Sequence, residues 1–529
     1  MWMGSADNEL ELFVGGRRVL VVGRLRQLLA CIVATTLFCL AAYASRYFNT
    51  AFMHDSLEIV SNQTSFNWQI GLGRWLQPML WAVRGNINAP WLLGLVSIPF
   101  FALASWLITD VLRIEDVVSS VCVSAIIVTA MPIALGHATF MPWVDVYAIS
   151  LFLAVLAVWL CVRSRYWHLA VLPLVGSLAL YQSYLQFFTG LSVLALMRCC
   201  FDKRTDIRMT GGLLAKMLFV LLIGLGIYWF STVLATQVTG IEKVDSYNGI
   251  SEVGAYDGGI KQVLLLLLDA WRFPFLWFWG ATGLIRRLLA LALGIVALVL
   301  AFNKVRFLPT EKKALFVVLL VVFPFAINIV YVISKGMEHD LMVHSFYLAY
   351  VLPLMLIDVA GDERKGESAF RFAFNKTERS LRVGMTFATC ILMIISLLSV
   401  RYANQIMLER QLEYESTHVI MARVIDRMEL TEGYVPGQTP VAFIGSPGDA
   451  VLHGREGFPE PRWGMKYLTG LTYSNPYRWY FETVLGYPIN LAPNNDIRNT
   501  SEVLSMGAFP AKDSVRMVDN MLVVKFVDE

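Results

Sequence analysis

Charged side chains are scarce in this sequence. They make up 16% of the 529 residues, whereas apolar side chains make up 57%. Several soluble cores would need more polar sequence to cover them, so the surplus of apolar residues has to face lipid. An excess of charge of one sign is also missing, because the formal net charge is only +3. The totals therefore argue against a nucleic-acid-binding protein and against a highly charged tail.

Motifs for disulfides, metals and nucleotides are missing too. The seven cysteines precede residue 400, lie in or beside apolar runs and have no metal-site or redox spacing. Glu338-His339-Asp340 has no second set of ligands at metal spacing. Gly445-Ser446-Pro447-Gly448 lacks the spacing of a dinucleotide fingerprint or a P-loop, and we interpret it as a turn. We therefore expect no metal and no cofactor.

What the sequence does contain is a series of long apolar runs. A transmembrane helix needs about 17–25 apolar residues to cross a hydrocarbon core of about 30 Å. The first run follows a basic segment and has no clear cleavage site, so we predict a retained helix after a cytoplasmic N-terminus of residues 1–26. The predicted fold is mainly α, a transmembrane bundle of about eleven spans. These lie near residues 27–47, 91–112, 117–136, 142–162, 166–181, 182–198, 214–236, 287–302, 314–334, 345–360 and 383–400.

One further apolar stretch, Val263 to Gly280, contains Asp269, Arg272 and Pro274. If it spans the membrane, two later basic loops face outward, against the positive-inside rule. If it lies in the membrane interface, both loops face the cytoplasm. We therefore predict an outer amphipathic segment within residues 262–286. The transmembrane domain then covers residues 27–400, with outer loops at residues 48–90 and 237–286.

The composition changes after Arg401, where charge, proline and glycine increase. Helix-like and strand-like stretches replace the long apolar runs. A helix-like stretch at residues 405–429 precedes predicted strands at residues 440–444 and 521–527. We predict a small α/β domain over residues 401–529 on the outer side of the membrane.

Several carboxylates on the predicted outer side are candidates for function, because ionisable residues near membrane depth are costly to keep. Asp55 and Glu58 follow the first span, Asp145 opens the fourth, and Asp257 and Asp269 flank the start of the interfacial segment. The first three also have a structural interpretation. Asp55 fits a solvated loop carboxylate, Glu58 fits a helix face one turn away, and Asp145 fits a helix cap worth about 1 kcal/mol.

Several short stretches resemble the bacterial Gtr type II family of O-antigen glucosyltransferases. In order, they are His54-Asp55-Ser56, Gly71-Leu72-Gly73-Arg74-Trp75-Leu76, Trp143-Val144-Asp145-Val146-Tyr147 and Leu180-Tyr181-Gln182-Ser183, followed in the tail by Thr439-Pro440-Val441-Ala442-Phe443-Ile444-Gly445. Together they cover most of the chain. The sequence departs from the family at His54, where an acidic neighbour of Asp55 is usual, and this puts a two-carboxylate site in doubt.

The resemblance implies a GT-C-type fold in a bacterial cytoplasmic membrane. It also implies a polyprenyl-phosphate sugar as donor and a hydroxyl of a polysaccharide or glycolipid as acceptor, with a flippase and a donor-synthesising transferase as companions. Inverting transfer from such a donor requires a base for the acceptor hydroxyl. One carboxylate suffices, because phosphate departs without a proton when cations stabilise its charge.

Asp55 is the expected base, with Glu58 and Asp145 as further catalytic candidates. His54 is an alternative base or sets the pKa of Asp55, and either role predicts activity that changes near about pH 6–7. Arginine pairs with phosphate oxygens in a geometry that lysine cannot match. The expected phosphate ligands are Arg74, Arg272, Arg286 and Arg287. The arginines at positions 74, 286 and 287 also fit headgroup anchors.

Trp75, Tyr181, Gln182 and His344 complete the expected substrate contacts, although His344 fits a plain loop histidine equally well. The main rival function is a multispan transporter or lipid flippase. We find no inverted repeat and no matched pair of broken helices, and alternating access does not need an outer domain. A polysaccharide polymerase or ligase is a further alternative, but such enzymes rely on a large late outer loop, whereas here the first loop is the charged one.

Overall fold

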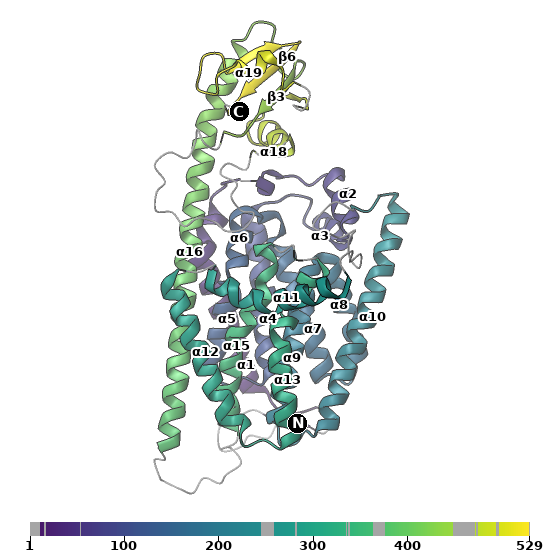
Figure 1. Ribbon diagram of the computed structural model, residues 1–529, viewed down its shortest axis with the longest axis vertical. Coiled ribbons are helices and arrows are strands. Elements are labelled where there is room, and N and C mark those ends of the chain that lie inside the picture. The colour runs from purple at the N-terminus through teal and green to yellow at the C-terminus, as the bar shows by residue number, and fades with distance from the viewer. Residues whose placement is uncertain are drawn as a thin grey trace.

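The computed structural model describes residues 11–14, 17–52, 54–244, 259–280, 283–334, 336, 339–362, 376–447, 471, 474–493 and 497–527. A bundle of long helices forms most of the molecule, and a small α/β domain lies beyond one end of it (Figure 1). Within the described residues, nine helices are long and apolar enough to cross a membrane, or ten if one bent pair counts as a single span. The predicted helical membrane bundle with a small C-terminal α/β region is thus confirmed.

The bundle begins after an antiparallel hairpin of β1 (Glu11–Val14) and β2 (Arg17–Leu20). Its helices are α1 (Val21–Phe48), α4 (Pro90–Leu112), α5 (Val117–Val128), α6 (Met131–Thr139), α7 (Val144–Arg163), α8 (Val171–Leu180), α9 (Leu185–Phe201), α10 (Ile207–Thr239), α11 (Gly259–Gly280), α12 (Leu284–Val305), α13 (Thr310–Ala326), α14 (Ile329–Ile333), α15 (Leu348–Asp362) and α16 (Lys376–Glu429).

Some predicted spans are broken or shortened in the structure. The run at residues 117–136 is divided into α5 and α6, which meet at 43°. Pro132 stands in the first turn of α6, where its missing N–H costs nothing, whereas inside a continuous helix it would remove a hydrogen bond. The run at residues 314–334 is likewise divided between α13 and α14, and the run at residues 166–181 forms only the short helix of Trp167–Leu180.

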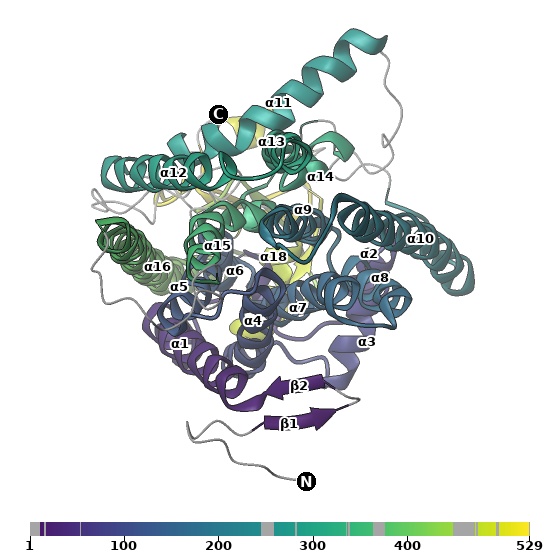
Figure 2. The same cartoon turned by 90° about the horizontal axis from the view of Figure 1, so that it is seen from below.

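Helix α11 runs across the bundle rather than along it. Figure 2 shows α11 lengthwise, while α4, α9 and α15 are seen nearly end-on. Asp269 and Arg272 form an exposed ion pair of 2.7 Å on this helix. Length and composition alone would allow α11 to span a membrane. Its crosswise direction is the one expected of an amphipathic helix in the interface.

Helix α16 joins the bundle to the α/β domain without a break. Its 54 residues give a length of about 80 Å at 1.5 Å per residue, and Figure 1 shows it running along the bundle and on into the domain. The change of composition after Arg401 therefore lies inside a helix and not in a linker.

The α/β domain contains a four-stranded sheet in the order β4-β3-β6-β5. Strand β3 (Pro440–Ile444) pairs in parallel with β4 (Asn490–Leu491) and β6 (Met521–Lys525), and β6 is antiparallel to β5 (Val515–Val518). Asp519 and Asn520 turn the β5–β6 hairpin with φ of 47° and 62°, as a tight hairpin turn of this hand requires. The strand predicted at residues 440–444 is confirmed, and the last strand ends at Lys525 rather than Val527.

The segment after α1 is built into the core of this domain. It forms the 3₁₀ helix η1 (His54–Leu57), which packs against α18 (Ser474–Trp479) and the π-helical turn η6 (Tyr480–Val484). Leu57 is only 1% exposed and belongs to the same apolar cluster as Phe481 and Leu522. The outer loop after the first span is therefore held by the C-terminal domain.

Replacement of Leu57 by Ala should loosen this contact. Removal of a buried leucine side chain costs about 2–5 kcal/mol, because the cavity does not fully close. We expect earlier proteolysis and faster hydrogen exchange in η1, α18 and η6, measured on the purified full-length protein. Leu504→Ala on α19 (Ser501–Leu504), where the side chain is largely exposed, is the control. Equal protection in both variants would contradict the coupling of η1 to the domain.

Candidate functional site

The expected catalytic residues lie at the end of the bundle that faces the α/β domain. Helix α1 ends at Phe48, η1 follows within a few residues, and α2 (Gln63–Gly71) and α3 (Leu76–Val83) complete the first loop. The side chain of Asn62 caps α2 by accepting hydrogen bonds from the backbone N–H groups of Thr64 and Ser65 at 3.0 and 3.2 Å. Figure 1 places α2 and α3 between the bundle and α18.

His54 and Asp55 form a close pair at the start of η1. Nδ1 of His54 lies 2.8 Å from Oδ1 of Asp55, and the side chains are 9% and 24% exposed. His54 has a φ of 49°, a left-handed conformation that is uncommon outside glycine and is found at functional sites. Asp55 is thus the more accessible of the two and has a histidine beside it, an arrangement suited to a carboxylate that accepts a proton.

Aromatic side chains surround this pair. The ring of Phe140 lies edge-on to His54 at 5.6 Å and to His339 at 5.8 Å. Tyr147 on α7 is within electrostatic reach of both Asp55 and Arg74. Tyr147 therefore connects the surroundings of the proposed base with those of the proposed phosphate ligand. Within the described ranges, no group of three or more His, Cys, Asp or Glu side chains gathers as a metal site would require.

Arg74, Tyr181 and Gln182 are brought together by the fold. Nε of Arg74 donates to Oε1 of Gln182 at 3.1 Å, and the guanidinium lies 4.9 Å from the ring centre of Tyr181. Gln182 is itself oriented, because its Nε2 donates to the carbonyl of Leu72 at 2.7 Å and to the hydroxyl of Tyr228 at 2.9 Å. These contacts hold the guanidinium in one place, as recognition of a phosphate requires.

Close packing supports the turn that carries Arg74. Gly73 has a φ of 80°, and a Cβ at this position would lie 2.7 Å from the hydroxyl of Tyr228. Only glycine fits both restrictions. Trp75 directly precedes α3 and packs, partly buried, against the main apolar core. The structure thus gives Trp75 a packing role beside Arg74.

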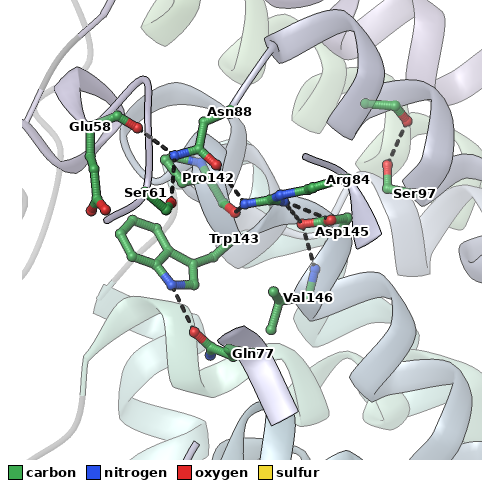
Figure 3. A network of polar contacts seen from close by, with 11 residues as sticks. Glu58, Ser61, Gln77, Arg84, Asn88, Ser97, Pro142, Trp143, Asp145 and Val146 are labelled. Atoms are coloured by element: carbon green, nitrogen blue, oxygen red, sulfur yellow. Dashed lines mark hydrogen bonds and ion pairs between the residues drawn. The ribbon is translucent and has the colours of Figure 1, made fainter. Parts of the chain in front are cut away.

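Asp145 is engaged by Arg84 and is almost fully buried. Nη1 of Arg84 lies 2.7 Å from each carboxylate oxygen of Asp145, and the side chains are 7% and 2% exposed. The backbone N–H of Val146 donates to Oδ1 of Asp145 at 2.9 Å. Figure 3 shows the pair at the centre of the polar network. With both oxygens engaged, Asp145 fits the helix-end role better than that of a base.

The same network ties the loop after α1 to α7. Nη2 of Arg84 donates to Oδ1 of Asn88 at 2.5 Å and to the carbonyl of Pro142 at 3.0 Å. Nδ2 of Asn88 donates to the backbone carbonyl of Glu58 and to the hydroxyl of Ser61 at 3.2 Å. The ion pair is therefore linked, through the Asn88 amide, to Glu58 and Ser61 in the segment after η1 (Figure 3).

The Glu58 side chain is directed away from Asn88 (Figure 3) and is 4% exposed. No described residue forms a hydrogen bond with its Oε1. Burial raises the pKa of Glu58 to about 7, and the charge of Asp55 adds to the increase, while Ser65, Ser61 and Arg84 partly offset it. Glu58 therefore takes up a proton at a higher pH than an exposed glutamate does.

The remaining candidates lie in other surroundings. Both ring nitrogens of His344 are engaged, Nδ1 with the hydroxyl of Tyr184 at 3.2 Å and Nε2 with the carbonyl of Ile127 at 3.0 Å, so it fits a buried structural histidine. Arg272 pairs with Asp269 on α11. Arg286 donates to the carbonyl of Leu398 and lies over Tyr402, and Arg287 lies over Trp279.

The sequence interpretation missed Arg84, Asn88 and His339. A buried Asp145 needs a nearby cation. Arg84 lies in the predicted outer loop, on the same side as Asp145, so this need could have pointed to it. Nothing in the local sequence marks Asn88. His339 was considered only as a metal ligand, and its approach to Asp55 requires the fold.

Loss of one partner of the Arg84–Asp145 pair should strongly destabilise the protein. Asp145→Asn or Arg84→Gln leaves an uncompensated buried charge, at a cost of about 3–5 kcal/mol. We expect a clear decrease in the Tm of the purified protein. The control is Arg24→Gln, whose 3.7 Å pair with Asp110 is half exposed and is worth at most about 1 kcal/mol. Similar Tm values for all three variants would contradict the importance of the buried pair.

Glu58 should make stability depend on pH. The pKa of its carboxyl is higher in the folded protein than in the unfolded chain, so the folded state is penalised as pH rises from about 4.5 to about 7. Glu58→Gln removes the penalty, which is at most about 3 kcal/mol. We expect the variant to gain Tm over the wild type at about pH 8 and little at about pH 4. A gain that is independent of pH would rule out titration of Glu58.

Comparison with known proteins identifies the family. The family model described as Glucosyl transferase GtrII matches residues 45–357, which is more than half of the chain. The matched region begins within α1, ends within α15 and contains His54, Asp55, Arg74 and His339, but not the α/β domain. No curated protein and no solved structure matches the chain. The chain belongs to the GtrII glucosyl transferase family, and its apolar helices make it a membrane glycosyltransferase.

Proposed function

We propose that this protein transfers a glucosyl unit from polyprenyl-phosphate glucose to a hydroxyl of a lipid-linked or surface polysaccharide, such as O-antigen. The observation that carries the proposal is the placement of Asp55 and Arg74 at the same end of the bundle, with Tyr147 within reach of both. A carboxylate and a fixed guanidinium are the two groups that transfer from a sugar phosphate requires.

The reaction is a single displacement with inversion at the anomeric carbon. Asp55 takes the proton from the acceptor hydroxyl as its oxygen forms a bond to the anomeric carbon. The bond from that carbon to the phosphate oxygen breaks at the same time, and the electron pair leaves with the phosphate. Arg74 stabilises the charge on polyprenyl phosphate, so no acid is needed for the leaving group. His54 is the alternative base, because its Nδ1 lies 2.8 Å from Asp55.

The proposed location is the outer face of a bacterial cytoplasmic membrane. The β1–β2 hairpin before α1 lies at one end of the bundle, and the α/β domain and η1 lie at the other (Figures 1 and 2). An N-terminus in the cytoplasm places most basic loops inside, in agreement with the positive-inside rule. The site then opens to the side where the acceptor is exposed. A donor made in the cytoplasm would need a transferase to synthesise it and a flippase to deliver it.

Asp55→Asn tests the proposal. The amide cannot accept the proton, so we expect the release of polyprenyl phosphate to decrease at least about 100-fold, measured with purified protein, polyprenyl-phosphate glucose and a polysaccharide acceptor. Glu502→Gln on the exposed face of α19 makes the same chemical change away from the site and should leave the rate unchanged.

Two outcomes would contradict the proposal. Near-normal transfer by Asp55→Asn would remove Asp55 as the base, and loss of the pH dependence in His54→Asn would then assign that role to His54. No transfer from several polyprenyl-phosphate hexoses, together with movement of the lipid across liposome membranes, would indicate a flippase instead.

A further inference from the structure

His339 lies at the start of a 3₁₀ helix, and its ring contacts the same Phe140 ring that contacts His54. It directly precedes η5 (Asp340–Tyr347), and its Nδ1 accepts a hydrogen bond from the backbone N–H of Leu341 at 3.2 Å. A neutral imidazole carries its proton on one nitrogen only. Because Nδ1 is the acceptor of this helix cap, the proton belongs on Nε2.

The surroundings disfavour the charged form of this histidine. Burial lowers the pKa of His339 below its usual value, and the neighbouring His54 lowers it further, while Asp55 partly offsets the decrease. Both residues of the His54–Asp55 pair therefore lie close enough to act on the His339 ring. The Phe140 ring contacts both histidines edge-on, and this geometry independently shows that His339 lies near His54.

Among the described residues, only the backbone N–H of Leu341 forms a hydrogen bond with the His339 ring, and it does so at Nδ1. The His339 side chain is partly exposed, so a bound ligand can reach its Nε2–H group. A donor close to a carboxylate suited to deprotonate a hydroxyl has the chemistry to hold an oxygen of a bound sugar.

We propose that His339 binds the sugar substrate, its Nε2–H donating a hydrogen bond to a sugar hydroxyl held beside Asp55. The proposal rests on the proposed function and adds a residue to its site. A neutral donor holds the hydroxyl without competing with Asp55 for the proton. The hydroxyl belongs either to the transferred glucose or to the acceptor sugar, and the two sources differ in which substrate loses affinity when the donor is removed.

Two substitutions separate this role from that of a helix cap. In His339→Asn the side-chain oxygen occupies the place of Nδ1 and caps η5, but no N–H reaches the position of Nε2. In His339→Gln the amide N–H reaches that position, and the cap is weakened. We expect the Asn variant to keep the wild-type Tm and to lose about tenfold to a hundredfold in kcat/KM. The Gln variant should lose Tm and keep more of its transfer activity than the Asn variant.

The measured KM values show which sugar is bound. A higher KM for polyprenyl-phosphate glucose assigns the hydrogen bond to the transferred glucose, and a higher KM for the polysaccharide assigns it to the acceptor. A merely structural role predicts the opposite order, with activity following Tm. Full activity of the Asn variant, or no advantage of Gln over Asn, would therefore overturn the proposal.

Asp55→Asn, measured in parallel, distinguishes a failure of the His339 proposal from a failure of the proposed function. If the wild-type protein transfers glucose and Asp55→Asn does not, a fully active His339→Asn refutes the role of His339 alone. If the wild-type protein transfers no hexose from a polyprenyl phosphate, the proposed function fails, and with it the role of His339.

Discussion

The ion pair between Arg84 and Asp145 joins the loop after α1 to the helical bundle, and the position of the proposed base depends on it. Charges with so little exposure are costly to bury, and they remain only where each satisfies the other. Arg84 also binds Asn88, which holds the backbone of Glu58 and the hydroxyl of Ser61. A side chain on α7 thus restrains the segment that follows Asp55.

The α/β domain restrains the same loop from the other side. Leu57 is buried in the domain core, and Phe52 packs against that core, with its ring 6.2 Å from that of Tyr414 on α16. Asp55 lies between these two apolar contacts. A base has to be held close to its productive position. Here the helical bundle and the α/β domain, which are distant in sequence, both hold the segment that carries Asp55. The continuous helix α16 fixes the spacing between them.

The architecture suits a reaction between a membrane lipid and a water-soluble chain. Arg74 is held by Gln182 and Tyr181 at the end of the bundle, where a lipid phosphate would lie at headgroup depth. Asp55 on η1 lies toward the α/β domain, which is the side from which the acceptor approaches in the proposed reaction. Buried Glu58 beside Asp55 is a second carboxyl, and burial raises its pKa to about 7.

The sequence by itself determined the helical membrane bundle, the small α/β domain, two of its strands and the candidates at Asp55, Arg74, Tyr181 and Gln182. Membrane thickness and strand periodicity leave a pattern along the chain, so they can be recognised without a fold. Only the tertiary structure decided that Asp145 pairs with Arg84 and that His339 approaches Asp55. These are contacts between distant segments, and their energy depends on burial and geometry, which no local run of residues contains.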